Sequence, residues 1–359
     1  MASKKYWWIV LVGLFAGIKL FSLFPAAVEE YYSGWLYPYI TAFLRIIFGW
    51  IPFSAGDLLY SAVALWLSWK LFRFFRVIAK RNADRYFWLN GLRQLAFFAL
   101  TVYVVFNVLW GLNYNRIGIA DQLELKVEMD NKDDLLAVVD QLVVKINELD
   151  TVARINRKYL AEKRNLFLGS VEAYDSLANY QPQFTYRYAS VKPSMFSYLG
   201  NYLGFTGYYN PFSGEAQVNT TVPVFALPFT TCHEIGHQLG YAKESEANFA
   251  GFLSARASPD PAFKYSVYFD MYLYARRYIY NLDSNLLKSY DNRLSPAFKK
   301  DYHELRDFWK RHANPVEKLV DIVYGQYLRA NEQPSGKLSY SEVISWLIAY
   351  YKKYGKEAI

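Results

Sequence analysis

The chain has 359 residues, of which 53% are hydrophobic, 19% aromatic and 20% charged, and its formal net charge is +8. This composition excludes intrinsic disorder, because burial of so many apolar side chains offsets the entropy lost on ordering. The single cysteine, Cys232, excludes a disulfide framework and a metal site built from several thiolates of one chain.

The basic excess is unevenly distributed along the chain. The first 112 residues contain 11 basic and 4 acidic side chains, whereas the remainder contains 29 basic and 28 acidic ones. Eight of the ten tryptophans also lie in the first 112 residues. We therefore predict two regions, an apolar and basic one at 1–112 and a charge-balanced one at 113–359.

Three segments of the first region are apolar over the roughly 20 residues that a helix needs to cross a lipid bilayer. They predict a three-helix transmembrane anchor with spans at about 6–28, 55–74 and 94–114. A cleaved signal peptide is the alternative for the first segment, because Lys4 and Lys5 precede it. The segment 31–44 is shorter and rich in aromatic residues, so we expect it to lie at the membrane surface.

The orientation of this anchor follows from its loops, because basic loops stay in the cytoplasm. The segment 70–93, around the loop between the second and third spans, has one acidic residue, Asp84, and seven basic ones: Lys70, Arg73, Arg76, Lys80, Arg81, Arg85 and Arg93. We predict a cytoplasmic N-terminus and, after three crossings, an extracytoplasmic region at 113–359. The charge excess then reflects topology, so we expect a lipid bilayer as partner and no nucleic acid.

The second region is predicted to be mainly α-helical. At 132–149, aliphatic side chains recur every three to four residues, which is the spacing of one helix face. Further helices are predicted at 151–168, 231–239, 245–257, 263–287, 296–312, 316–330 and 340–354. A small β element is expected between 181 and 228, where 215–224 has the composition of a strand.

An HExxH motif begins at His233 and ends at His237. Residues i and i+4 share one face of a helix, so both imidazoles can bind one metal ion while Glu234 lies beside them. One of the threonines before the motif is expected to cap this helix, and Gly240 is expected to end it. Two histidines packed in a core are the alternative interpretation.

Catalytic zinc takes three protein ligands and leaves one position for water. Glu244 and Glu246 follow the motif, and on a helix they diverge by about 200°, so only one of them can be the third ligand. We prefer Glu244, with Glu246 as the alternative, because Asn248 lies one turn after Glu244 and can hydrogen-bond a histidine ligand. Either glutamate could instead complement the helix dipole. His303 and His312 are expected on a helix surface.

The motif together with Glu244-x-x-x-Asn248 resembles the gluzincin metallopeptidases, which use HExxH and a downstream Glu that usually heads an ExxxD sequence. Asn248 stands where Asp is usual, and the interval between His237 and Glu244 is short. The resemblance implies a zincin-like domain in which His233, His237 and Glu244 bind Zn²⁺.

A second resemblance covers most of the chain. Three apolar N-terminal segments and the stretches 204–219, 233–249 and 323–343 are similar to the bacterial membrane family known as domain of unknown function 3810. This resemblance implies a multi-pass protein of the bacterial cytoplasmic (inner) membrane with a zinc-peptidase-like domain, and it supplies no substrate.

The implied reaction is hydrolysis of a peptide bond by a zinc-activated water, with Glu234 as the general base. We also expect 215–221 to be an edge strand that pairs with an extended peptide substrate. Two alternatives remain: a non-enzymatic membrane protein with a structural or inactive zinc site, and a zinc amidase acting on cell-wall peptides. Glu234 favours an enzyme, because a purely structural site has no use for a general base.

Overall fold

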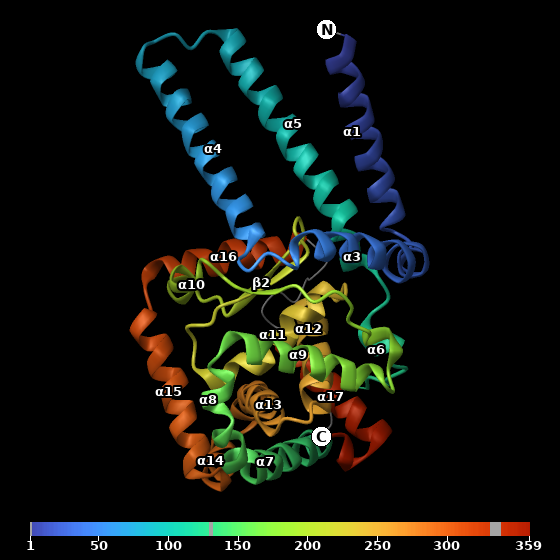
Figure 1. The fold of residues 1–359 in the computed structure, drawn as a ribbon, viewed down its shortest axis with the longest axis vertical. Helices are drawn as coiled ribbons and strands as arrows, with labels where there is room; N and C mark the ends of the chain where they lie inside the picture. The colour runs from blue at the N-terminus through green and yellow to red at the C-terminus, as the bar shows by residue number, and fades with distance from the viewer. Residues whose placement is uncertain (1, 129–131, 331–338) are drawn as a thin grey trace.

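The structure is a computed structural model that describes residues 2–128, 132–330 and 339–359. These residues are mainly helical and contain one small sheet, as the sequence predicts. Figure 1 shows three long helices that project from one end of the remaining structure: α1 (Ala2–Phe21), α4 (Ala55–Ala79) and α5 (Arg85–Leu109). The segment 331–338, which belongs to one of the stretches that resemble a known family, lies outside the described residues.

The chain bends sharply after α1. The short helix α2 (Pro25–Ala27), the π-helix η1 (Val28–Leu36) and α3 (Tyr37–Phe48) follow it, and this second arm makes an angle of 106° with the first. In Figure 1, α3 lies across the base of the projecting helices. The segment 31–44, expected at a membrane surface, falls within η1 and α3.

Within the described residues, one helix by itself has the length and hydropathy needed to cross a membrane, and that helix is α5. The bent arms around Phe21 count as a second candidate if they form one span. The structure therefore supports the predicted three-helix transmembrane anchor only in part.

The bounds of α5 differ from the expected span at 94–114. The helix begins at Arg85, because Asp84 caps it by accepting a hydrogen bond from the backbone N–H of Phe87 at 2.7 Å. It ends at Leu109, and the 3₁₀ helix η2 (Gly111–Asn115) that follows packs into the rest of the protein.

The remaining helices surround the main hydrophobic core, which draws on α7, α9, α11, α12, α13 and α17. The described helices after η2 are α6 (Ile119–Gln122), α7 (Lys132–Ile155), α8 (Arg157–Leu160), α9 (Lys163–Ala178), η3 (Pro182–Phe184), α10 (Ser197–Leu203), η4 (Val224–Ala226), α11 (Leu227–Gln238), α12 (Glu244–Ala257), α13 (Pro261–Leu282), α14 (Ser284–Arg293), α15 (Pro296–His312), α16 (Pro315–Ala330), α17 (Ser339–Tyr354) and η6 (Lys356–Ala358).

Two predicted helices are each divided in the structure. The helix expected at 263–287 breaks at Asp283, whose carboxylate accepts hydrogen bonds from the backbone N–H groups of Asn285 and Leu286 and so starts α14. The helix expected at 151–168 is divided among the end of α7, the single turn α8 and the start of α9.

The sheet has the strand order β1-β3-β2, with β1 (Val191–Pro193), β2 (Gly207–Asn210) and β3 (Glu215–Val218). Strand β3 pairs in parallel with β1 and antiparallel with β2, so Gly207 lies opposite Val218. The prediction that 215–221 forms an edge strand is therefore wrong, because β3 already has a neighbour on each side. Strand β2 is an edge of the sheet.

Candidate metal centre

The helix α11 carries the HExxH motif and begins earlier than the sequence suggests. It starts at Leu227, with Pro228 in the first turn. Backbone N–H groups in the first turn of a helix make no hydrogen bond within it, so a proline, which has no N–H, is tolerated there. The hydroxyl of Thr231 donates to the carbonyl oxygen of Leu227 at 2.7 Å. Thr231 is thus one turn inside the helix, and the prediction of a threonine cap is wrong.

Gly240 ends the motif helix as predicted. Its φ of +87° is accessible to glycine at little cost, and the backbone N–H of Tyr241 donates to the carbonyl oxygen of Gly236 at 3.2 Å. The chain then reverses, and α12 packs against α11. This turn brings Glu244, the first residue of α12, back to the motif.

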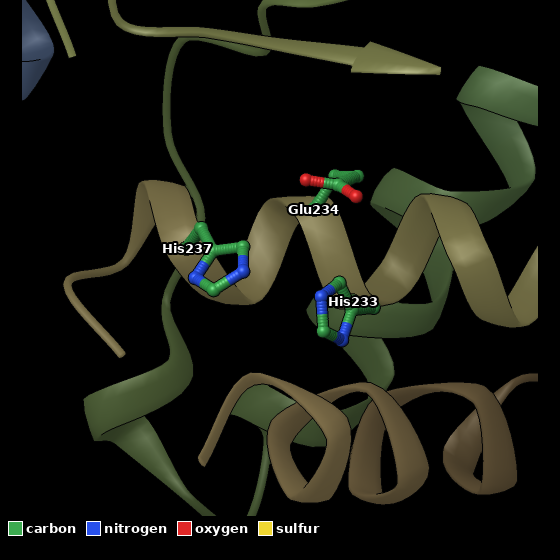
Figure 2. A group of neighbouring side chains, drawn as sticks. All are labelled: His233, Glu234 and His237. Carbon is green, nitrogen blue, oxygen red and sulfur yellow. The ribbon is translucent and has the colours of Figure 1, made fainter. Parts of the chain in front are cut away.

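Three side chains of α11 gather at one place. The metal-binding atoms of His233, Glu234 and His237 all lie within 4.8 Å of one another. In Figure 2, the two imidazoles lie along one side of the helix and Glu234 projects from it toward the sheet. The i, i+4 spacing of the histidines produces this arrangement.

The carboxylate of Glu244 completes the cluster. Its Oε2 lies 3.4 Å from Nε2 of His233, and its Oε1 lies 3.7 Å from Nε2 of His237. Zinc binds nitrogen and oxygen ligands at roughly 2.0–2.2 Å with tetrahedral geometry, which places neighbouring ligand atoms about 3.4 Å apart. Two imidazole nitrogens and a carboxylate at these separations fit a zinc ion.

The outer ring nitrogen of His237 is hydrogen-bonded to the backbone. Its Nδ1 lies 2.8 Å from the carbonyl oxygen of Tyr241, and a carbonyl accepts only, so Nδ1 carries the proton. The lone pair of Nε2 is then directed toward the cluster. A hydrogen bond of this kind from the outer ring nitrogen is the usual way in which proteins orient a metal-binding histidine.

Glu246 lies elsewhere. Its carboxylate is 3.9 Å from the ammonium of Lys243, and one of its oxygens lies 3.5 Å from the position of a Cβ on Gly118. Burial raises the pKa of Glu246 above its ordinary value. The structure therefore brings Glu244 to the histidines and directs Glu246 toward the segment before α6, as expected for residues two apart on a helix.

Glu234 occupies a buried position beneath strand β2. A Cβ on Gly207 would lie 2.5 Å from Oε1 of Glu234, so only glycine leaves room for the carboxylate in its present place. Among the described residues, no group donates a hydrogen bond to Oε2. Burial raises the pKa of Glu234 to about 8, and the nearby charge of His233 opposes this rise.

The two histidines have different acidities. Burial lowers the pKa of His237 to about 4, so its imidazole is neutral near pH 7 and able to bind a metal. Burial also lowers the pKa of His233, but the carboxylates of Glu244 and Glu234 outweigh this effect and raise the pKa above its ordinary value. Neutral imidazole and carboxylate together are a typical zinc-binding set.

Asn248 lies beside His233, where its amide contributes to the raised pKa of the imidazole. The expected hydrogen bond to the outer ring nitrogen is not formed, because within the described residues Nδ1 of His233 has no partner. The amide oxygen of Asn248 instead accepts a hydrogen bond from the hydroxyl of Tyr274 at 3.4 Å.

The sequence prediction missed Asp270 on α13. Burial raises the pKa of the Asp270 carboxyl to about 7, and the nearby charge of His233 opposes this rise. A signal was present, because Asp270 is the one acidic residue in the apolar and aromatic sequence of α13.

His303 and His312 lie on α15, where Nδ1 of His312 is 2.8 Å from the carbonyl oxygen of Phe308.

Cys232, next to the first histidine, is a buried side chain of the core, as predicted. Burial raises the pKa of its thiol to about 12, so the reactive thiolate is scarce at neutral pH.

Two residues of the N-terminal region contact the motif helix directly. The indole Nε1 of Trp110, next to the end of α5, donates to the carbonyl oxygen of His237 at 3.0 Å. The hydroxyl of Tyr37 on α3 donates to the carbonyl oxygen of Gln238 at 2.8 Å. The first 112 residues therefore form part of the structure around the histidines.

The comparisons with known proteins identify a family. The model of the family described as "Protein of unknown function (DUF3810)" matches residues 32–348, and the chain belongs to this family. The family membership predicted from the sequence is thus confirmed. No curated protein and no solved structure matches the chain.

Proposed function

We propose that the protein is a membrane-anchored, zinc-dependent metallopeptidase. The observation that carries the proposal is the position of the Glu244 carboxylate, within 3.4 Å and 3.7 Å of the Nε2 atoms of His233 and His237. These three side chains would hold the ion. Glu234, whose metal-binding oxygen lies within 4.8 Å of the histidine nitrogens, would act as the general base.

Zinc bound by three ligands lowers the pKa of a water molecule toward 7 and polarises a peptide carbonyl. Oε2 of Glu234 has no hydrogen-bond donor among the described residues, so it is available to take the proton of the attacking water. The same oxygen then delivers this proton to the leaving nitrogen. Gly207 keeps the carboxylate in place by leaving space above it.

The positive charge of a bound metal also bears on the protonation of Glu234. Burial raises the pKa of this carboxyl to about 8 in the metal-free site. A divalent cation held by the neighbouring side chains lowers the pKa of nearby acids. Metal binding would therefore convert Glu234 into the carboxylate that a general base requires.

We further propose that α1, α4 and α5 all cross the bacterial cytoplasmic membrane, with the N-terminus inside and residues 113–359 outside. The support is the common direction of the three helices and the basic residues in the loop between α4 and α5 and on the adjacent parts of both helices. A reporter fused to the C-terminus and active only outside the cytoplasm is the expected result. Activity confined to the cytoplasm would contradict this orientation.

The enzymatic proposal is tested on the full-length protein in detergent or nanodiscs. Bound zinc and hydrolysis of a mixed peptide library are measured for the wild type, Glu234→Gln and, as a matched control of a buried acid, Glu246→Gln. We expect Glu234→Gln to keep zinc and lose at least about 100-fold in rate, with Glu246→Gln near wild type. Zinc-loaded protein that cleaves no peptide would favour a structural zinc site.

A further inference from the structure

The structure exposes an apolar surface on α10 and α16, away from the metal centre. On α10 and immediately before it, three large apolar side chains are more than half exposed: Met195, Tyr198 and Leu199. On α16, four aliphatic side chains are exposed to a similar degree: Val316, Leu319, Ile322 and Val323. We call these seven residues the α10–α16 face. Clusters of this kind usually mark an interaction surface.

The two helices pack against each other. The side-chain amide of Asn314, just before α16, donates to the carbonyl oxygen of Tyr202 on α10 at 2.6 Å. A Cβ on Gly204, which ends α10, would lie 3.8 Å from a carboxylate oxygen of Glu317. The exposed residues of α16 recur at intervals of three and four, so they share one side of that helix.

The α10–α16 face lies close to the start of α4. The Asp57 carboxylate, in the first turn of α4, accepts a hydrogen bond from the backbone N–H of Met195 at 2.7 Å, so α10 begins where α4 begins. Figure 1 shows α10 and α16 at the end of the molecule from which α1, α4 and α5 project, at the level of α3. The two helices that carry the face thus lie at the base of the apolar helices.

We propose that the α10–α16 face lies in the interfacial region of the bilayer that α1, α4 and α5 cross, so that the extracytoplasmic domain rests on the membrane. Tyrosine and aliphatic side chains on amphipathic segments are suited to the boundary between headgroups and acyl chains. The inference rests on the membrane anchor in the proposed function and is independent of zinc.

The test uses full-length protein in nanodiscs with single cysteines introduced at Leu199 or Leu319 and labelled with bimane. The native Cys232 is buried and does not compete for the label. Val144→Cys on α7, at the opposite end of the molecule, is the matched exposed control, and Leu95→Cys on α5 is the reference for the bilayer. Quenching is measured with lipids that carry a nitroxide near the headgroup end of the acyl chain.

We expect these lipids to quench the labels at 199 and 319 at least twofold more than the label at 144. Quenching no greater than at 144 would overturn the inference. Protection from aqueous iodide without lipid quenching would also overturn it, because a protein partner would then cover the face. If the label at 95 is not quenched either, the proposed membrane anchor is wrong. If the label at 95 is quenched and those at 199 and 319 are not, only the proposed interfacial position of the α10–α16 face is wrong.

Discussion

The indole Nε1 of Trp110 lies 3.0 Å from the carbonyl oxygen of His237 and donates a hydrogen bond to it. The two rings also meet edge to face, with their centroids 5.9 Å apart. Trp110 directly follows α5, the helix best suited to cross a membrane, and only 5% of its surface is exposed. The end of a candidate membrane span therefore positions a histidine of the metal centre.

This contact predicts that Trp110→Phe weakens zinc binding. The phenyl ring keeps most of the packing but removes the donor, at a cost of about 1 kcal/mol. We expect a zinc affinity lower by about fivefold, measured by competition with a chelator. Trp50→Phe, at a tryptophan that is 78% exposed, is the control. Equal affinities of the two variants would contradict a positioning role for Trp110.

The two glutamates of α12 should differ sharply in metal binding. Glu244→Gln removes a proposed zinc ligand. Loss of a residue that only hydrogen-bonds a metal ligand already lowers metal affinity by about 10–100-fold, so we expect Glu244→Gln to lower zinc affinity by at least about 100-fold. Glu246→Gln should leave zinc affinity within about threefold of wild type, because its carboxylate lies beside Lys243. Isothermal titration with zinc distinguishes the two variants, and the reverse order would assign Glu246 as the ligand.

Gly207→Ala tests the space above the general base. The added Cβ would lie 2.5 Å from Oε1 of Glu234, and the carboxylate can rotate away more easily than the strand can move. We expect zinc to be retained and the rate of peptide hydrolysis to fall by about 100-fold. Gly118→Ala, where the nearest atom would be 3.5 Å away, is the control. Full activity of Gly207→Ala would contradict the requirement for glycine beside the carboxylate of Glu234.

The acidity of Glu234 predicts a pH dependence of the zinc-free protein. Its pKa is raised to about 8 in the folded state, so between about pH 5 and 8 the folded state binds more protons than the unfolded state. The free energy of unfolding therefore falls as the pH rises, by at most about 1.4 kcal/mol per pH unit. His237 has the opposite effect below about pH 6.5, because its pKa is lowered.

The measurement is the thermal unfolding midpoint in chelator from pH 6.5 to 8, for the wild type and Glu234→Gln. Wild type should lose stability relative to the variant across this range, since glutamine does not titrate. A constant difference between the two proteins would show that Glu234 has an ordinary pKa.

The sequence was most informative where the relevant geometry is local. The histidines meet because residues four apart share a helix face, and Gly240 ends the helix because its φ is positive. Helical spacing also shows that only one of Glu244 and Glu246 can face the histidines. These features depend on a few neighbouring residues, so they can be read without knowledge of the packing.

Features that depend on packing were not predicted. Asp270 reaches the surroundings of His233 only because α13 packs beside α11, and Trp110 approaches His237 from a segment far away in the chain. The assignment of β3 as an edge strand failed for the same reason, since strand order is set by pairing that the sequence of one strand does not encode.

The most direct test of the central claim is X-ray absorption at the zinc edge on the purified full-length protein. The account predicts one zinc per chain with nitrogen and oxygen ligands at about 2.0–2.2 Å, including two imidazoles, and no sulfur ligand. The imidazole signal should decrease in His237→Ala. Protein that neither retains nor takes up zinc, or that shows sulfur at about 2.3 Å, would contradict the proposed metal centre.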